Sequence, residues 1–130
     1  MNFGGCQRGG TVDNEIIQYF VVNHDLKMEA GKVAAQVAHA ATISTINMVS
    51  ASNCQFPDYF DYFVEWYQSG MSKVVLKGTE EELFKLKENG FYTIRDKSYQ
   101  EEPTGALTVV SLPPMPRIIG QRFIGEFSLY

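Results

Sequence analysis

Short continuous hydrophobic runs and helically spaced hydrophobic residues divide the chain into segments of two kinds. The segment EIIQYFVVN, residues 15–23, is an almost unbroken apolar run, which is typical of a strand covered on both faces. From about residue 30 to residue 50 the pattern predicts a helix, because at about 100° per residue the small and apolar residues form one stripe. The stripe consists of Val33, Val37, Ala40, Ala41, Ser44 and Met48.

Turn and capping residues mark the ends of the later elements. Gly70 closes a predicted aromatic helix, and Thr79 and Glu82 form a capping box at the start of the next helix. Gly90 follows the last turn of that second helix. The predicted elements beyond residue 50 are helices over 58–70 and 79–90, strands over 72–78, 91–96 and 105–112, and a short helix within 113–130.

This order of elements predicts an α/β fold, a three-layer α/β/α sandwich with a four-stranded mixed sheet. Residues 1–14 are expected to be a flexible leader and residues 15–130 the folded domain. Ligands of such sheets collect beyond the carboxyl ends of the strands, where helix N-termini also point. We therefore expect a site at the loops 24–32 and 96–104.

Composition narrows the class of protein. With 130 residues, 45% hydrophobic and 20% charged, the chain has the size and composition of one soluble globular domain. No apolar run approaches the roughly 20 residues of a membrane span, so we expect a cytoplasmic protein with no membrane association. The net charge of -4 argues against a generally basic nucleic-acid binder and leaves a local basic patch open. Cys6 and Cys54 fit free thiols better than one disulfide, and they form no zinc motif.

Polar residues also follow helical spacing on the helix predicted over 30–50. Lys32, Gln36 and His39 project within an arc of roughly 60°, away from the apolar stripe. A solvated helix face is the simplest interpretation of such a pattern. However, Lys32 lies in the first turn, where the helix dipole disfavours a cation, and it could bind a phosphate together with the free backbone N–H groups. His39 alone is more often structural, and we predict no metal site.

Asp96 and Thr108 are the other candidates for chemistry. Asp96 directly follows the third predicted strand, where its carboxylate could act as a general base, form an ion pair or cap a turn. Thr108 lies within a predicted strand, where it is either a β-branched strand former or a hydroxyl donor. The tyrosines Tyr59, Tyr62 and Tyr67 could stack on bases, but acidic residues on the same predicted helix favour a packed core helix instead.

One long motif resembles a known family. The segment DLKMEAGKVAAQVAHAA, residues 25–41, resembles the archaeal and eukaryotic type of peptidyl-tRNA hydrolase. That family carries Asp-Leu-x-Met, then Gly-Lys-hydrophobic-Ala-Ala-Gln, then Ala or Ser before His-Ala. The strand KVVLK (73–77), the segment from Asp96 to Val109 and the terminal FSLY continue the resemblance, which covers about residues 17–130.

The resemblance implies hydrolysis of the ester between a peptide and the 3′ end of tRNA, without a cofactor. It implies catalytic roles for three residues: Lys32 would bind phosphate or stabilise charge on the attacked carbonyl, Asp96 would orient or deprotonate water, and Thr108 would supply a hydrogen bond. His39 would have a structural role. The substrate, peptidyl-tRNA, would further contact Gln36, Lys73, Lys77, Lys97 and Gln100.

The chain departs from the family motif at three places. The family's Gly-Lys-Gly-Lys is Glu29, Ala30, Gly31 and Lys32 here, and its Asp-Ala-Gly-Arg-Thr-Gln is the segment DKSYQE, residues 96–101. The second change places Gln100 where the family has an active-site threonine, and the third is Thr104 in the position of the family's proline before glycine, with Pro103 one residue earlier. The alternative hypothesis is therefore a catalytically silent relative that binds a protein, a nucleotide or another anion in the same cleft. The sequence leaves the oligomeric state open, with a homodimer as one expectation.

Overall fold

The computed structural model describes residues 14–98 and 105–130. The predicted leader before residue 14, with Cys6, and the predicted contact residue Gln100 lie outside the described residues. The elements are β1 (Ile16–Asn23), α1 (Ala30–Met48), α2 (Phe60–Gln68), β2 (Lys73–Gly78), α3 (Glu80–Lys87), β3 (Tyr92–Asp96), β4 (Ala106–Ser111), β5 (Met115–Pro116), α4 (Arg117–Ile124) and β6 (Ser128–Leu129), with 3₁₀ turns over His24–Leu26 and Pro57–Tyr59.

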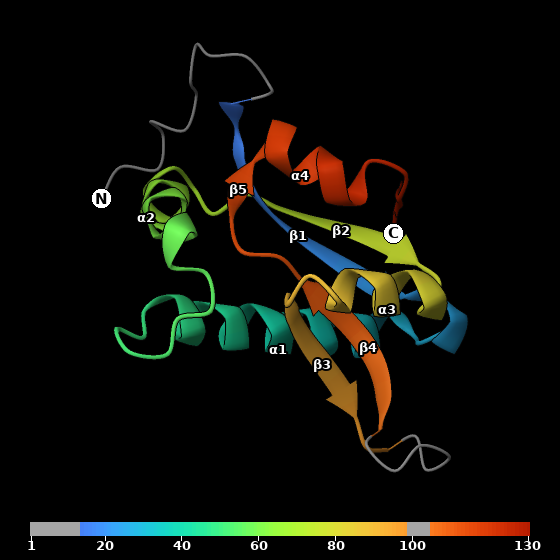
Figure 1. The fold of residues 1–130 in the computed structure, drawn as a ribbon. Helices are drawn as coiled ribbons and strands as arrows, with labels where there is room; N and C mark the ends of the chain where they lie inside the picture. Colours follow the sequence, from blue (N-terminus) through green and yellow to red (C-terminus); the bar gives the residue numbers. More distant parts are fainter. Residues whose placement is uncertain (1–13, 99–104) are drawn as a thin grey trace.

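Strand β1 is the centre of the sheet. It pairs in parallel with β2 and antiparallel with β4, and the strand order is β3-β4-β1-β2-β6. All eight residues of β1 are buried, which confirms the prediction of a strand covered on both faces. Its alternate side chains enter different cores: Val21 packs with α3 and α4 residues, whereas Phe20 and Val22 pack with α1 residues. Helices thus cover both faces, with α3 in front of the sheet and α1 behind it (Figure 1).

The prediction of four strands was wrong, because the described residues form a six-stranded sheet. The four long strands are those expected from the sequence. The two additional strands, β5 and β6, have two residues each, and they pair with the start of β1 and with β2. Two residues carry no recognisable alternation of polar and apolar positions, and prolines around β5 argue against a strand except at an edge.

The helices follow the sequence signals closely. The predicted stripe of α1 faces the sheet, where Val33, Ala40, Ser44 and Met48 are buried. The capping box of α3 is present, with Thr79 accepting from the backbone of Glu82 at 3.2 Å. In the part of the chain that the structure describes, no helix is both long and apolar enough to cross a membrane.

The aromatic helix α2 belongs mainly to the core. Phe63 and Trp66 are buried, and the Trp66 indole donates to the backbone carbonyl of Ser72 at 2.8 Å. Tyr59 and Tyr62 pack against this core, so only Tyr67 of the three tyrosines considered for base stacking is exposed, at 44%. The packing supports the prediction of a core helix.

Three strands end at the same edge of the sheet. Because β4 is antiparallel to both β1 and β3, these two strands run in the same direction, as does β2. Their last residues, Asn23, Gly78 and Asp96, therefore lie at one edge, and α1 also begins there. This carboxyl edge is where the sequence predicts a site.

Candidate active site

An ion pair joins α1 to the end of β3. The Nζ atom of Lys32 contacts Oδ2 of Asp96, and the side chains are 39% and 14% exposed. Helix α1 has no acidic residue in its first turn, and its N-cap residue Glu29 makes no side-chain capping bond. Asp96 therefore supplies, from another element, a negative charge beside Lys32. A cation that the helix dipole disfavours is stabilised by this arrangement.

Ser98 holds the other side of the same carboxylate. Its backbone N–H donates to Oδ1 of Asp96 at 2.9 Å. The contact with Lys32, followed by hydrogen bonding from Ser98, lowers the pKa of Asp96 to about 2. Asp96 is consequently ionised at neutral pH.

The start of β4 brings the chain close to Asp96. Gly105 has a φ of +81°, and a Cβ atom at this position would lie 2.7 Å from the carbonyl carbon and oxygen of Asp96. Glycine is required here both by the backbone conformation and by the close approach. Arg95 donates from Nη1 to the Gly105 carbonyl at 3.1 Å, which links β3 and β4 beside the site.

A β-bulge directs Thr108 into the site. Ile94 pairs with Val109 and the next residue, Arg95, pairs with Leu107. Thr108 therefore has no partner on β3 and is the extra residue of the bulge. Regular alternation would place Thr108 on the face opposite Val109, which packs with α1. The extra residue instead turns the Thr108 hydroxyl toward α1, and bulges commonly have this effect beside active sites.

The buried Thr108 hydroxyl connects the bulge to α1. Its Oγ1 lies 2.7 Å from Oε1 of Gln36 and 3.2 Å from the carbonyl oxygen of Ile94. One hydroxyl hydrogen serves one acceptor at a time, so the Gln36 amide can also rotate and donate to Thr108 while the hydroxyl donates to Ile94. Either arrangement fixes Gln36 beside the Lys32 and Asp96 pair.

The three residues of the polar stripe predicted on α1 therefore have different environments. Lys32 and Gln36 contact the sheet, so a solvated face does not describe them, whereas His39 is exposed. Two further residues fix the loop before α1: the buried Asn23 donates to Leu107 at 2.9 Å, and Asp25 accepts from the N–H of Glu80 at 2.9 Å. The Asp of the Asp-Leu-x-Met sequence thus anchors this loop to the start of α3.

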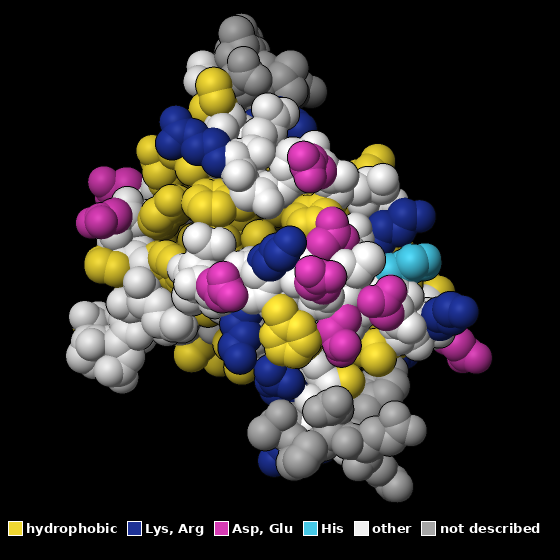
Figure 2. Space-filling model, turned by 45° about the vertical axis from the view of Figure 1, so that its right-hand side comes forward, with side chains coloured by type: hydrophobic (Ala, Val, Ile, Leu, Met, Phe, Trp, Pro, Cys, Tyr) yellow, Lys and Arg dark blue, Asp and Glu magenta, His cyan; other side chains and the backbone are white. Residues whose placement is uncertain are grey.

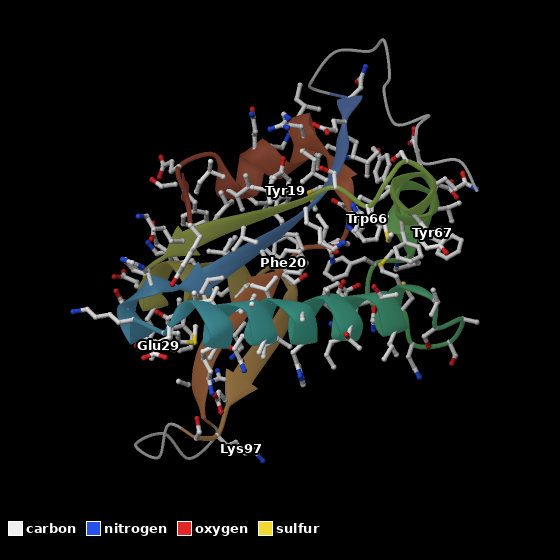
Figure 3. All side chains as sticks on the ribbon, turned by 180° about the vertical axis from the view of Figure 1, so that it is seen from behind. Tyr19, Phe20, Glu29, Trp66, Tyr67 and Lys97 are labelled. Carbon is white, nitrogen blue, oxygen red and sulfur yellow. The ribbon has the colours of Figure 1, made fainter. Side chains whose placement is uncertain are left out.

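The predicted contact lysines occupy different parts of the molecule. Lys97 is exposed and follows Asp96 directly, below the start of α1 at Glu29 in Figure 3. Lys77 is exposed near the carboxyl edge. Lys73 is four residues earlier on β2, about 13 Å away at the rise of a strand, and its Nζ lies 5.1 Å from the Trp66 ring centre. The structure therefore does not bring Lys73 to the Lys32 and Asp96 pair.

Sequence reasoning missed two residues at this edge. Ser98 bonds to Asp96, but nothing in the sequence distinguishes it from an ordinary loop serine. Lys27 is exposed in the loop after β1, with a left-handed φ of 50°. A positive φ at a non-glycine residue in a loop beside the site is a structural signal that no residue pattern provides.

Comparison with known proteins agrees with the geometry. The family model described as Peptidyl-tRNA hydrolase PTH2 matches residues 16–130, from the first residue of β1 to the end of the chain. The chain belongs to the PTH2 family. The resemblance noted in the sequence is thereby confirmed, and the matched range contains every described residue of the site.

Archaeal relatives of the PTH2 family match over most of their length. A protein of Staphylothermus marinus named peptidyl-tRNA hydrolase is 36% identical over 124 residues, which are 90% of this chain and 97% of that protein. A protein of the same name from Thermococcus sibiricus is 34% identical over 119 residues, 86% of this chain and 95% of the relative. The likeness thus extends over the whole PTH2 domain.

Proposed function

We propose that this chain is a peptidyl-tRNA hydrolase, which cleaves the ester between a peptide and tRNA in the cytoplasm and so returns tRNA to translation. Its membership of the PTH2 family supports the reaction. The observation that carries the assignment of the site is the pair of Lys32 and Asp96 at the carboxyl edge of the sheet. Beside it, the Thr108 hydroxyl and Gln36 supply neutral hydrogen-bonding groups.

Lys32 stabilises the charge that develops during attack on the ester. Water adds to the carbonyl carbon, and negative charge builds on the carbonyl oxygen before the ribose oxygen leaves. A fixed cation near that oxygen can contribute a few kcal/mol to the transition state. The contact with Asp96 holds the flexible Lys32 side chain in place before substrate arrives.

Asp96 orients groups in the site and does not act as a strong base. A general base works best with a pKa near the working pH. The pKa of Asp96 is about 2, because Lys32 and Ser98 stabilise its ionised form. Its carboxylate is therefore suited to accept a hydrogen bond from the attacking water and to position Lys32. Thr108 and Gln36 complete the polar wall beside the reacting ester.

The tRNA backbone approaches the carboxyl edge. Lys27, Lys77 and Lys97 are exposed around this edge and supplement Lys32. Acidic side chains gather on the face that carries α3, among scattered basic ones (Figure 2), and Glu80, Glu81 and Glu82 form the first turn of α3, which begins at this edge directly after β2. Phosphates are repelled there and attracted to the lysines, so we expect affinity to fall as salt rises.

The decisive experiment is release of the peptide from an N-acylated aminoacyl-tRNA by the purified protein. We expect turnover by the wild-type chain, with a Gln100→Thr variant assayed alongside because the family has threonine at this position. An equal rate in the variant fits an active site that tolerates the natural glutamine, whereas turnover by the variant alone would support the silent relative. Absence of turnover in both proteins at high enzyme concentration, with the fold intact, would establish the silent relative instead.

A further inference from the structure

Asn23, the last residue of β1, is a buried amide that bridges two segments of the candidate site. The residue is only 1% exposed. Its Nδ2 atom donates to the backbone carbonyl of Leu107 on β4 at 2.9 Å, and its Oδ1 atom accepts from the backbone N–H of Asp25 at 3.0 Å. A carbonyl only accepts and a backbone N–H only donates, so this position requires a donor and an acceptor on one short side chain.

The bond to Leu107 holds the β-bulge. Backbone pairing of β1 with β4 reaches Val22 and Val109, and Asn23 follows as the next residue, opposite the bulge. There its side chain joins the two strands. The Leu107 carbonyl belongs to the planar peptide unit that leads into Thr108. The bond therefore fixes the plane from which the Thr108 side chain projects.

The bond between Asn23 and Asp25 holds the loop that leads into α1. It caps the 3₁₀ turn His24–Leu26, which lies between β1 and the start of α1. Asp25 is itself fixed, since its Oδ2 atom accepts from the backbone N–H of Glu80 at 2.9 Å. Lys32 lies in the first turn of α1, so its distance from the bulge depends on this loop.

We propose that Asn23 is a positioning residue for ester hydrolysis: its amide holds the bulge at Thr108 and the loop before Lys32 at a fixed separation. The proposal rests on the proposed peptidyl-tRNA hydrolase activity. Reacting groups must keep a close spacing for the chemical step, and small displacements are costly. Asn23 is buried, so its replacement lowers the rate of that step and leaves tRNA binding unchanged.

Gln18 provides a matched control at the other end of β1. It is also a buried amide, 1% exposed, and its Nε2 atom donates to the Ser44 hydroxyl and, at 3.3 Å, to the Leu112 carbonyl. It lies about 17 Å from Asn23 at the rise of a strand. A carboxyl group of the same shape at either position disturbs the buried strand, but the site lies beside Asn23.

The first test is Asn23→Asp. The introduced carboxylate still accepts from Asp25 but cannot donate to the Leu107 carbonyl, so we expect kcat to fall about tenfold at pH 8 with KM unchanged. Burial and the facing carbonyl oxygen raise the pKa of the new carboxyl group. Once protonated, this group donates again, so most of the rate should return at pH 5.5. Asp96 stays ionised over this range, because its pKa is about 2.

The pH dependence distinguishes positioning from a loss of stability. Each rate is divided by the wild-type rate at the same pH, which removes the titration of groups that the proteins share. Gln18→Glu should lower the urea midpoint as Asn23→Asp does, but it should keep kcat within about twofold of wild type at both pH values. Similar losses of kcat in the two variants, or a loss in Asn23→Asp that is equal at pH 5.5 and pH 8, would overturn the proposal.

Asn23→Ser decides the question if the buried carboxylate prevents folding. Serine can accept from the Asp25 N–H, as it does in similar turns, but it is too short to reach the Leu107 carbonyl. We expect kcat to fall about threefold to tenfold with KM unchanged. An unchanged kcat would contradict the role of Asn23 and leave the proposed function intact.

The side-chain NMR signal of Lys32 supplies a readout that does not depend on turnover. In protein with labelled lysine, the Cε signal of Lys32 should shift in Asn23→Ser and stay in place in Gln18→Glu. An unmoved signal in Asn23→Ser would reject positioning. A shifted signal together with no peptide release by the wild-type chain would instead reject the proposed function and, with it, the role of Asn23 in hydrolysis.

Discussion

The two sides of α1 differ in what the sheet places opposite them. On the catalytic flank, Lys32 and Gln36 contact Asp96 and Thr108 from β3 and β4. On the other side, which we call the apolar flank, α1 borders two grooves of about 640 and 530 Å³ toward β2 and α2. The residues of α1 that line these grooves are Ala30, Val33, Ala34, Val37, Ala38, Ala41, Thr42, Thr45 and Ile46, and Val49 directly after the helix lines one of them as well.

The difference shows that a polar side chain on α1 takes part in the site only where another element supplies a hydrogen-bonding or charged group opposite it. Lys32 is oriented by a carboxylate at the end of β3, and Gln36 by a hydroxyl that a β-bulge turns toward it. Lys73 is the lysine that borders both grooves of the apolar flank, and its ammonium interacts with the Trp66 ring and the Met71 carbonyl. Lys32 and Lys73 carry the same charge, but only Lys32 is held beside a carboxylate in the candidate site.

The largest effect is expected from removing the cation of the catalytic flank. Lys32→Ala should lower kcat/KM at least tenfold, a loss of about 1.4 kcal/mol of transition-state stabilisation. Lys73→Ala, the matched change on the apolar flank, should alter kcat/KM less than about twofold, since an exposed cation at that distance contributes little. Steady-state hydrolysis of peptidyl-tRNA measures both. Equal losses in the two variants would show that both lysines act only through non-specific electrostatic attraction of the tRNA phosphates.

A smaller effect is expected from the hydroxyl at the bulge. Thr108→Val keeps the shape of the buried side chain and leaves the Gln36 amide and the Ile94 carbonyl without this partner. We expect the free energy of unfolding to fall by about 1–2 kcal/mol and kcat by about fivefold. Thr45→Val on the exposed apolar flank is the control, expected to stay within about 0.5 kcal/mol. Urea unfolding and initial rates test the pair, and unchanged rates in Thr108→Val would remove Thr108 from the site.

The bulge also marks the limit of prediction from sequence. The apolar run of β1, the capping box at Thr79 and the Gly70 helix end act through neighbouring residues, so the sequence predicts them. The bulge at Thr108 depends instead on how β3 and β4 pair, and pairing is a property of two segments that are distant in sequence. Strict alternation would have turned the Thr108 side chain away from α1.

In the candidate site, too, the sequence predicted some features and could not predict others. The motif predicted Lys32, Gln36, Asp96 and Thr108 as candidates, and the fold brings all four together. It could not predict the contact of Ser98 with Asp96, because a serine two residues after an aspartate is common in loops. Lys73 matches the family strand but is the first residue of β2, whereas the site lies at the other end of the strand. The sequence alone did not show which end of β2 faces the site.

The third expected effect concerns pH and the ion pair of the catalytic flank. The pKa of Asp96 is about 2 in the folded chain, below its ordinary value of 3.8, because Lys32 and Ser98 bind the ionised form. Its contribution to stability is therefore fully present above about pH 4 to 5 and is lost as the pH falls toward 2. Asp96→Asn should be less stable than wild type at pH 6, and the difference should shrink at pH 3. Urea midpoints at the two pH values measure this, and a constant difference would contradict the role of the charge.

The smallest effect on catalysis is expected on the apolar flank itself. Ile46 is 61% exposed at the groove between α1 and α2, so Ile46→Glu buries no charge. Both kcat/KM and the free energy of unfolding should stay close to wild type, the former within about twofold and the latter within about 0.5 kcal/mol. Sedimentation velocity on the same samples tests the homodimer expected from the sequence. If wild type is a dimer and Ile46→Glu is a fully active monomer, the apolar flank serves association and the catalytic flank works within one chain. A monomeric variant that has lost activity would instead show that the two flanks are coupled, because the change lies outside the contacts of Lys32, Gln36, Asp96 and Thr108.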